Sequence, residues 1–572
     1  MPLPLLPCLL LFFPLTFGLA WPLAARLALD PAEKLCATAV LSLLATYLAA
    51  FAIYLLRLPA TVFWVLPAMA VAGLVTDRRM LGTVGRDAEA RALLIGQLLV
   101  TGWCTGWLFF ITSYSGGGWT SDWFEHWERA RFFLERWSHD SKFLGFGLLP
   151  ARPPLANLVT GALLAVTRQD FEHYQLFTTL LSCLAFLPAA LLVRRFHSRL
   201  PGAAPAGALA AAAVFTVLVM LNPSFVQNAT FAWTKLIAVF FVLSGLYFFL
   251  RTLDGDAPRA AGGLCAVALA AGILTHYSAG PYVLMLAVAW PVLNRARWPD
   301  QAFWRQTALL GVIGGLVLAT WFGWSLAVYG APTTLLSNSS VSVTDAQTGN
   351  QLAKVALNLR DTLVPHFLRP LDGALIAQPS PWGYWRDWCF QLYQLNLFFV
   401  FGSVAWLVLG RELVRSWPWA PPRSRWFWAG FSGGVILLGV AVHGARDTWG
   451  LAHICLQAIV VLGLAYLAAR WSILGRGWRL VLLAGATLDF CLGIALHFAV
   501  QRYAFDRWLT PGRPYGDILK SYSESSLMNA AAKLQHHLGF FGDVYHLPAA
   551  LVLALLAGIL TLAVARAVRH PS

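Results

Sequence analysis

Long apolar stretches separated by short polar segments recur along the whole chain. A membrane hydrocarbon core of ~30 Å requires about 20 mostly apolar residues in a helix, and most of these stretches have about that length. We therefore predict an all-α fold, a polytopic membrane bundle of about 13–15 transmembrane helices. The predicted spans are 5–28, 34–57, 59–75, 92–112, 174–193, 206–222, 235–250, 260–275, 281–293, 307–328, 391–410, 427–443, 451–468, 480–500 and 548–566.

Two apolar stretches need a separate interpretation. The stretch 155–166 follows Pro153 and Pro154 and is too short to cross a membrane, so we predict a helix that lies in the interface or dips into it. The first stretch, 5–28, has no basic segment before it and no clear cleavage site of small residues. We therefore expect it to be a retained helix rather than a cleaved signal peptide.

Composition supports the membrane class and excludes others. The chain of 572 residues is 58% hydrophobic and only 12% charged, which does not describe a soluble protein. Its net charge of +15 does not indicate a nucleic-acid partner, because the arginines occur in short clusters between apolar stretches. The eight cysteines show neither a Cys-x-x-Cys motif nor metal-ligand spacing, so we expect neither a disulfide framework nor a zinc site.

The arginine clusters predict the orientation of the chain in a bacterial-type inner membrane. By the positive-inside rule these clusters face the cytoplasm, and the three long connections 113–173, 329–390 and 501–547 face the periplasm. The chain then divides into N-terminal transmembrane helices (1–91), a core that contains the first periplasmic loop (92–328), a second loop (329–390) and C-terminal helices with the last loop (391–572).

Acidic residues gather on the predicted outer side. Sixteen of the 26 lie in its loops, whereas only Asp489, with His497, is predicted to be buried within a helix. A transporter that uses charged residues at the bilayer midplane would bury more of them inside its helices. We therefore expect the chemistry at the outer rim.

The densest outer cluster opens the first loop. Asp122, Glu125 and His126 stand at i, i+3 and i+4, so they share one face of a helix. Such a cluster suits a general base or a cation site. The structural alternative is a capping box of Asp122 with Glu125, beside an interfacial stripe that includes Trp123 and Trp127. Both interpretations can hold, because a capped helix is a rigid platform for a catalytic carboxylate.

The features that follow this cluster are Arg152-Pro153-Pro154-Leu155, Gln169-Asp170-Phe171-Glu172-His173-Tyr174, Asn222-Pro223, Trp233-Thr234-Lys235 and Thr275-His276-Tyr277. Together they resemble the GT-C glycosyltransferases, a superfamily that includes protein O-mannosyltransferases, lipid A aminoarabinose transferases and many bacterial family-39-like enzymes. The resemblance covers about residues 103–281. Two departures are that about three helices precede the acidic loop, where members usually have one, and that Asp-x-x-Glu-His replaces the adjacent Asp-Glu of the O-mannosyltransferases.

The resemblance implies transfer of a sugar from a polyprenyl-phosphate donor to a hydroxyl group of a lipid, glycan or protein acceptor at the periplasmic face. Asp122 would be the catalytic base, assisted by Glu125 and His126, with no required cofactor and a divalent cation at Asp122 and Glu125 as an option. Lys235 stands out as a phosphate ligand, although a snorkelling lysine is the structural alternative. All phosphate candidates lie at predicted outer helix ends: Lys235, His276, Arg369, His443, Arg446, His453 and Arg502.

Two other functions fit parts of the sequence. A transporter or flippase of a lipid-linked saccharide would also need a cationic cleft open to the lipid, but it would be accessible from both faces. A polysaccharide polymerase or ligase would make the loop 501–547 the sensitive region. No nucleotide-binding glycine loop is present in the sequence, which argues against an ATP-driven pump and a nucleotide-sugar enzyme.

Overall fold

The computed structural model describes residues 5–569 apart from 113, 115–121, 144–146, 168–169, 203, 255, 257, 338–350, 366–367, 369–388, 390–391, 395, 443–452 and 496–538. Within these ranges all regular structure is helical, apart from one isolated bridge between Phe143 and Gly147. The predicted all-α class is therefore confirmed for the described part of the chain.

Helices of the first half follow the predicted spans closely. In chain order they are α1 (Leu5–Phe17), α2 (Trp21–Ala25), α3 (Pro31–Leu55), α4 (Val65–Thr76), α5 (Arg78–Arg86), α6 (Ala88–Leu108), α7 (Asp122–Glu135), α8 (Leu155–Ala165), α9 (Phe171–Cys183), α10 (Phe186–Ser198), α11 (Pro205–Met220), α12 (Pro223–Thr230), α13 (Lys235–Thr252), α14 (Arg259–Thr275) and α15 (Gly280–Leu293).

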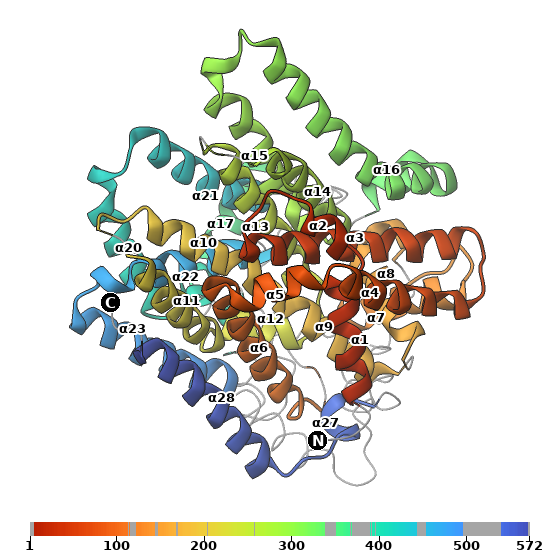
Figure 1. The fold of residues 1–572 in the computed structure, drawn as a ribbon, viewed down its shortest axis with the longest axis horizontal. Helices are drawn as coiled ribbons and strands as arrows, with labels where there is room; N and C mark the ends of the chain where they lie inside the picture. Colours follow the sequence, from red (N-terminus) through yellow and green to blue (C-terminus); the bar gives the residue numbers. More distant parts are fainter. Residues whose placement is uncertain are drawn as a thin grey trace.

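The second half contains the longest helix and the most peripheral ones (Figure 1). Its helices are α16 (Gln301–Leu336), α17 (Gln351–Leu363), α19 (Leu397–Phe401), α20 (Ala405–Ser416), α21 (Pro422–Val442), α22 (His453–Ala469), α23 (Arg476–Phe490), α27 (Phe541–Val544) and α28 (Ala549–Arg569).

Each predicted span coincides with at least one helix. Among the described residues six helices are long and apolar enough to cross a membrane, or up to eight if two bent pairs are each one span, and further apolar helices are shorter. The chain is a multi-pass membrane protein. Some predicted spans are interrupted: 5–28 divides into α1 and α2, and α12 turns away from α11 by 67°.

The protein core surrounds α9 and α13. Residues 235–250 of α13 are all buried, and α13 packs against α14, α10, α22 and α9. By contrast, only 11% of the apolar part of α16 and 17% of that of α28 is buried within the protein. Figure 1 places these two helices at opposite edges of the bundle. Because so little of each is buried in protein, we expect their apolar side chains to face lipid.

One end of the core is fixed by ion pairs between arginines and carboxylates. Arg194 on α10 pairs with Asp30 at 2.7 Å and with Glu89 on α6 at 2.8 Å, and Arg251 on α13 pairs with Glu33 on α3 at 2.7 Å. These pairs connect four helices at the ends that the sequence predicts to be cytoplasmic.

The short helix α8 lies inside protein. Residues 155–164 are all buried, and α8 packs against α3, α7, α9 and α14. Its length is the predicted one, too short for a span. Because α8 carries the first predicted outer loop against the core, it positions α7 and the acidic cluster.

Candidate functional site

Helix α7 carries the predicted acidic cluster, and most of its described side chains are buried in the protein. Asp122 is its first residue, and the side chain of Asp122 lies outside the described part of the structure. Glu125, His126 and Arg129, which follow on the same face, are 6%, 2% and 0% exposed. The helix face predicted by the i, i+3, i+4 spacing is therefore buried. Helical geometry places Asp122 at the N-terminal end of this face.

Two arginines hold the carboxylate of Glu125. Its Oε1 accepts hydrogen bonds from Arg129 Nη2 at 2.7 Å and Nε at 3.1 Å, and its Oε2 accepts from Arg152 Nε at 3.1 Å. Burial alone would raise the pKa of Glu125, but Arg152 and Arg129 outweigh burial and hold that pKa well below its usual range. Glu125 is therefore a permanently charged group and a poor proton acceptor.

Arg129 fixes the loop that follows α7. Its guanidinium also donates to the carbonyls of Leu148 at 2.9 Å and Leu149 at 2.5 Å, and it lies 4.3 Å from the ring centroid of Phe143. A fully buried guanidinium needs such a complete set of acceptors, because burying an unpaired charge is costly. The Glu125–Arg129 pair thus sets where the segment leading to Arg152 runs.

His126 connects three segments of the site. Its Nδ1 lies 3.3 Å from Asn157 Oδ1 on α8, and its Nε2 lies 3.5 Å from Thr234 Oγ1, just before α13. Burial, together with the charge of Arg152, lowers the pKa of His126 to about 3. His126 is therefore neutral near pH 7. Because an amide oxygen only accepts, Nδ1 carries the proton and Nε2 is the acceptor.

Lys235 and His276 are two further buried residues near these groups. Lys235 is only 4% exposed, and its Nζ lies 3.9 Å from the ring centroid of Trp233, within cation–π range. This burial differs from that of a snorkelling lysine, whose ammonium reaches water. A small cavity beside Lys235 is also lined by Ser278, Tyr282 and Gln457.

The tautomer of His276 is set by its own backbone turn. Its Nδ1 accepts from the amide of Ser278 at 3.0 Å, so the ring proton of the neutral form lies on Nε2, which can donate. Burial lowers the pKa of His276 well below its usual range, and the charges of Arg152 and Lys235 lower it further. His126 and Glu125 also act on His276, so all four groups lie within electrostatic range of His276.

The structure does not describe the side chains of several residues that the sequence predicted for the site. Arg369, His443, Arg446 and Arg502 lie outside the described residues, as does His497. His453 is the first residue of α22, and its side chain is also outside the described part. Their roles stay predictions. Asp489 is buried as predicted, and its carboxylate accepts from Tyr393 and from the amide of Ser403, both at 2.8 Å.

A divalent cation does not fit at Glu125. Both carboxylate oxygens already accept hydrogen bonds from guanidiniums, whose charges repel a metal ion. Elsewhere among the described residues, Asp170, Glu172 and His173 have potential ligand atoms within 4.8 Å of one another. These three residues lie at the start of α9.

Sequence reasoning overlooked four side chains of this site. They are Arg129, Arg152, Asn157 and Thr234. The spacing of Arg129, four residues after Glu125, was a usable signal for the ion pair. Arg152 stands directly before the two prolines of the motif at 152–155, but its distance in sequence from Glu125 hides their contact.

Comparisons with known proteins give a structural likeness only. No family model matches the chain, and no curated protein does. Two similar solved structures are ArnT from Cupriavidus metallidurans bound to undecaprenyl phosphate and the same protein in the apo state. Both are 14% identical with a TM-score of 0.43; the first match covers 83% of this chain and 78% of that one, and the second 82% and 76%.

Proposed function

We propose that this chain is a membrane glycosyltransferase that moves a sugar from a polyprenyl-phosphate donor to a hydroxyl acceptor at the periplasmic face. The observation that carries the proposal is that cationic side chains adjoin the helix that begins at Asp122. Arg152 donates to Glu125 at 3.1 Å, and Lys235 directly follows Thr234, whose Oγ1 lies 3.5 Å from His126 Nε2. The neutral donor His276 lies within electrostatic range of Arg152 and Lys235. These are the groups needed to bind a phosphate and to accept a proton beside it.

The cationic side of the site suits the leaving group. When the bond between the sugar and the phosphate oxygen breaks, the polyprenyl phosphate gains one negative charge. Arg152 and Lys235 supply positive charge where that charge develops, and His276 Nε2 donates a hydrogen bond. Since Lys235 and His276 are buried, their interactions are less screened than in water.

We assign different roles to the two carboxylates of Glu125 and Asp122. Glu125 accepts hydrogen bonds from two arginines and is poorly suited to take a proton, so we assign it the positioning of Arg152. Asp122 is then the base that takes the acceptor proton as the new bond to the sugar forms. A base opposite the leaving phosphate leads to inversion at the anomeric carbon.

A donor-consumption assay tests this proposal. The full chain is purified into lipid nanodiscs and supplied with a panel of synthetic polyprenyl-phosphate sugars, and release of polyprenyl phosphate is measured. Asp122→Asn should lower kcat by roughly 10²–10⁴-fold, which is the usual contribution of general acid–base catalysis. Asp140→Asn, an exposed position after the end of α7, is the matched control and should leave kcat unchanged.

Two outcomes would contradict the proposal. If Asp122→Asn turns over as fast as Asp140→Asn, the base lies elsewhere. If the wild-type chain consumes no donor but moves labelled donor between leaflets of a vesicle, the flippase alternative is correct.

A further inference from the structure

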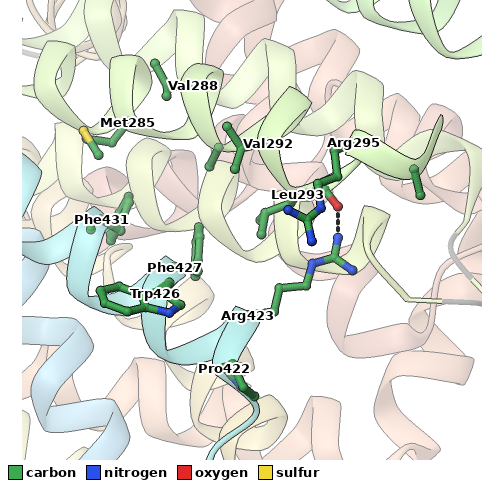
Figure 2. Close-up of a pocket in the computed structure, with 13 residues that line it drawn as sticks. Met285, Val288, Val292, Leu293, Arg295, Pro422, Arg423, Trp426, Phe427 and Phe431 are labelled. Carbon is green, nitrogen blue, oxygen red and sulfur yellow. Dashed lines mark hydrogen bonds between the residues drawn. The ribbon is translucent and has the colours of Figure 1, made fainter. Parts of the chain in front are cut away.

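A groove separate from the proposed site runs between α15 and α21, two neighbouring helices in Figure 1. Its volume is about 700 Å³. Figure 2 shows Met285, Val288 and Val292 of α15 facing Phe427 and Phe431 of α21, with Trp426 at the rim. The walls are apolar over the length of α15.

The groove opens toward the membrane. Val288 and Val292 are 51% and 57% exposed, and Trp426 is 75% exposed. Neither α15 nor α21 contains an acidic residue. In a multi-pass membrane protein, apolar side chains exposed on such helices contact lipid chains rather than water.

One end of the groove carries two cations. Arg295 follows the end of α15, and Arg423 lies in the first turn of α21 and donates to the carbonyl of Leu293 (Figure 2). That hydrogen bond holds the Arg423 guanidinium at the mouth of the groove. Both arginines are exposed.

These charges are not compensated in the way that others at this face are. In the part of the chain that the structure describes, no carboxylate lies within ion-pair distance of Arg295 or Arg423, whereas Arg194 and Arg470 pair with carboxylates at 2.7 and 3.0 Å. Two neighbouring positive charges at the end of a lipid-facing groove suit an anion that also has an apolar tail.

We propose that this groove binds one anionic phospholipid of the inner leaflet. An acyl chain lies between α15 and α21, and the headgroup phosphate accepts hydrogen bonds from Arg295 and Arg423. Basic pockets between transmembrane helices on the cytoplasmic side are suited to anionic headgroups, and the positive-inside rule places these arginines on that side. Along α15, 14 residues separate this end from the His276 turn, about 20 Å at 1.5 Å per residue.

Native mass spectrometry of the detergent-purified full chain tests the proposal. The probes are phosphatidylglycerol, phosphatidylcholine and glycerol 3-phosphate, which has the anion but no tail. We expect one phosphatidylglycerol to bind more tightly than phosphatidylcholine, and glycerol 3-phosphate to show no saturable binding. The double variant Arg295→Gln with Arg423→Gln should weaken phosphatidylglycerol binding by roughly 30-fold, about five-fold for each charge.

The control double variant removes equal charge elsewhere. Arg259→Gln with Arg305→Gln changes two exposed arginines outside the groove and should leave phosphatidylglycerol affinity unchanged. Equal losses in the two double variants would show a non-specific charge effect and overturn the proposal. Equal affinity for phosphatidylglycerol and phosphatidylcholine, or saturation by glycerol 3-phosphate at the same concentration, would overturn it too.

A steric pair tests the acyl-chain part. Gly430 lines the groove, and a Cβ built there meets no heavy atom within 4 Å, so Gly430→Phe can fill the groove without a backbone clash. Gly433 on the same helix has equally open space but does not line the groove. Gly430→Phe should abolish phosphatidylglycerol binding while Gly433→Phe retains it. Retention in both variants would overturn the proposal.

Discussion

At the scale of single residues, α7 contains two glutamate–arginine pairs of the same spacing in very different surroundings. Glu125 and Arg129 are buried and share their network with Arg152, whereas Arg131 and Glu135 pair at 2.7 Å with side chains 39% and 33% exposed. An exposed pair contributes little because water and salt screen it. Removing one partner of a buried pair leaves an uncompensated charge.

We predict that Glu125→Gln destabilises the protein far more than Glu135→Gln does. The buried change should lower the free energy of unfolding by about 3–5 kcal/mol, because Arg129 stays buried without its counter-charge. The exposed change should cost about 0.3–0.5 kcal/mol. Thermal or denaturant unfolding of both variants in the same nanodiscs gives the comparison. Similar losses in both would show that the Glu125 network is not a stabilising unit.

Burial of neutral His126 predicts a pH dependence of stability. Its pKa is lowered to about 3 in the folded chain, against about 6.5 for an unperturbed histidine. The unfolded chain therefore binds a proton that the folded chain does not, and stability falls as pH drops below about 6.5 toward the folded pKa. The expected slope is about 1.4 kcal/mol per pH unit from this group.

The measurement is the unfolding free energy of wild type and His126→Asn between pH 7.5 and 5. The variant should lose this contribution and show a shallower slope, although its stability at pH 7.5 also falls through the lost contacts with Asn157 and Thr234. His276→Asn is the companion variant, because the pKa of His276 is lowered in the same direction. Parallel curves for wild type and His126→Asn would refute the assignment of a neutral, buried His126.

At the scale of helices, polar side chains that cap helix N-termini can also connect neighbouring helices. Asn222 caps α12 by accepting from the amide of Phe225 at 2.8 Å, and its amide nitrogen donates to the buried carbonyl of Val400 at 3.0 Å. Asp300 caps α16 at the protein surface by accepting one hydrogen bond from the amide of Ala302 at 2.8 Å. The two caps therefore differ mainly in one contact: Asn222 also donates to a buried carbonyl, and Asp300 does not.

We predict that Asn222→Ala costs about 2–4 kcal/mol of stability and Asp300→Ala about 1 kcal/mol. Both variants lose a helix cap, but only the first leaves a buried carbonyl without its donor. Chemical unfolding of both variants in mild detergent measures the difference. An Asn222→Ala loss no larger than that of Asp300→Ala would contradict the role assigned to the Val400 contact.

The apolar pattern predicted where helices lie better than where they break. Spans such as 235–250 and 260–275 correspond to α13 and α14 almost residue by residue, because length and hydrophobicity suffice for a helix in lipid. The division between α9 and α10 near Leu184 has a local cause that the apolar pattern does not include, because Pro188 cannot donate to the carbonyl four residues before it. In the site, the helical spacing predicted that Glu125 and His126 share a face, but the contact of Arg152 with Glu125 depends on tertiary folding over 27 residues.

At the scale of the whole molecule, charge is divided between two sides. The helix ends on one side are rich in arginine and include the ion pairs of Arg194 and Arg251 and the end of the groove at Arg423. Helix α7 and its acidic cluster lie in a long loop that is predicted to face the opposite side. The positive-inside rule gives this division a direction, and the proposed function requires that direction because the donor phosphate must meet Asp122 on the periplasmic side.

We predict that Ser138, close after α7, is accessible from the periplasm and that Arg305, at the start of α16, is accessible only from the cytoplasm. Single cysteines at these positions, in a chain whose eight native cysteines are replaced by alanine or serine, are treated with a membrane-impermeant maleimide. In spheroplasts Ser138→Cys should be labelled and Arg305→Cys should not, whereas both should react after permeabilisation because both positions are exposed. Labelling of Arg305→Cys alone before permeabilisation would show that the orientation is the reverse of the predicted one. Asp122 would then lie on the cytoplasmic side, which contradicts the positive-inside rule.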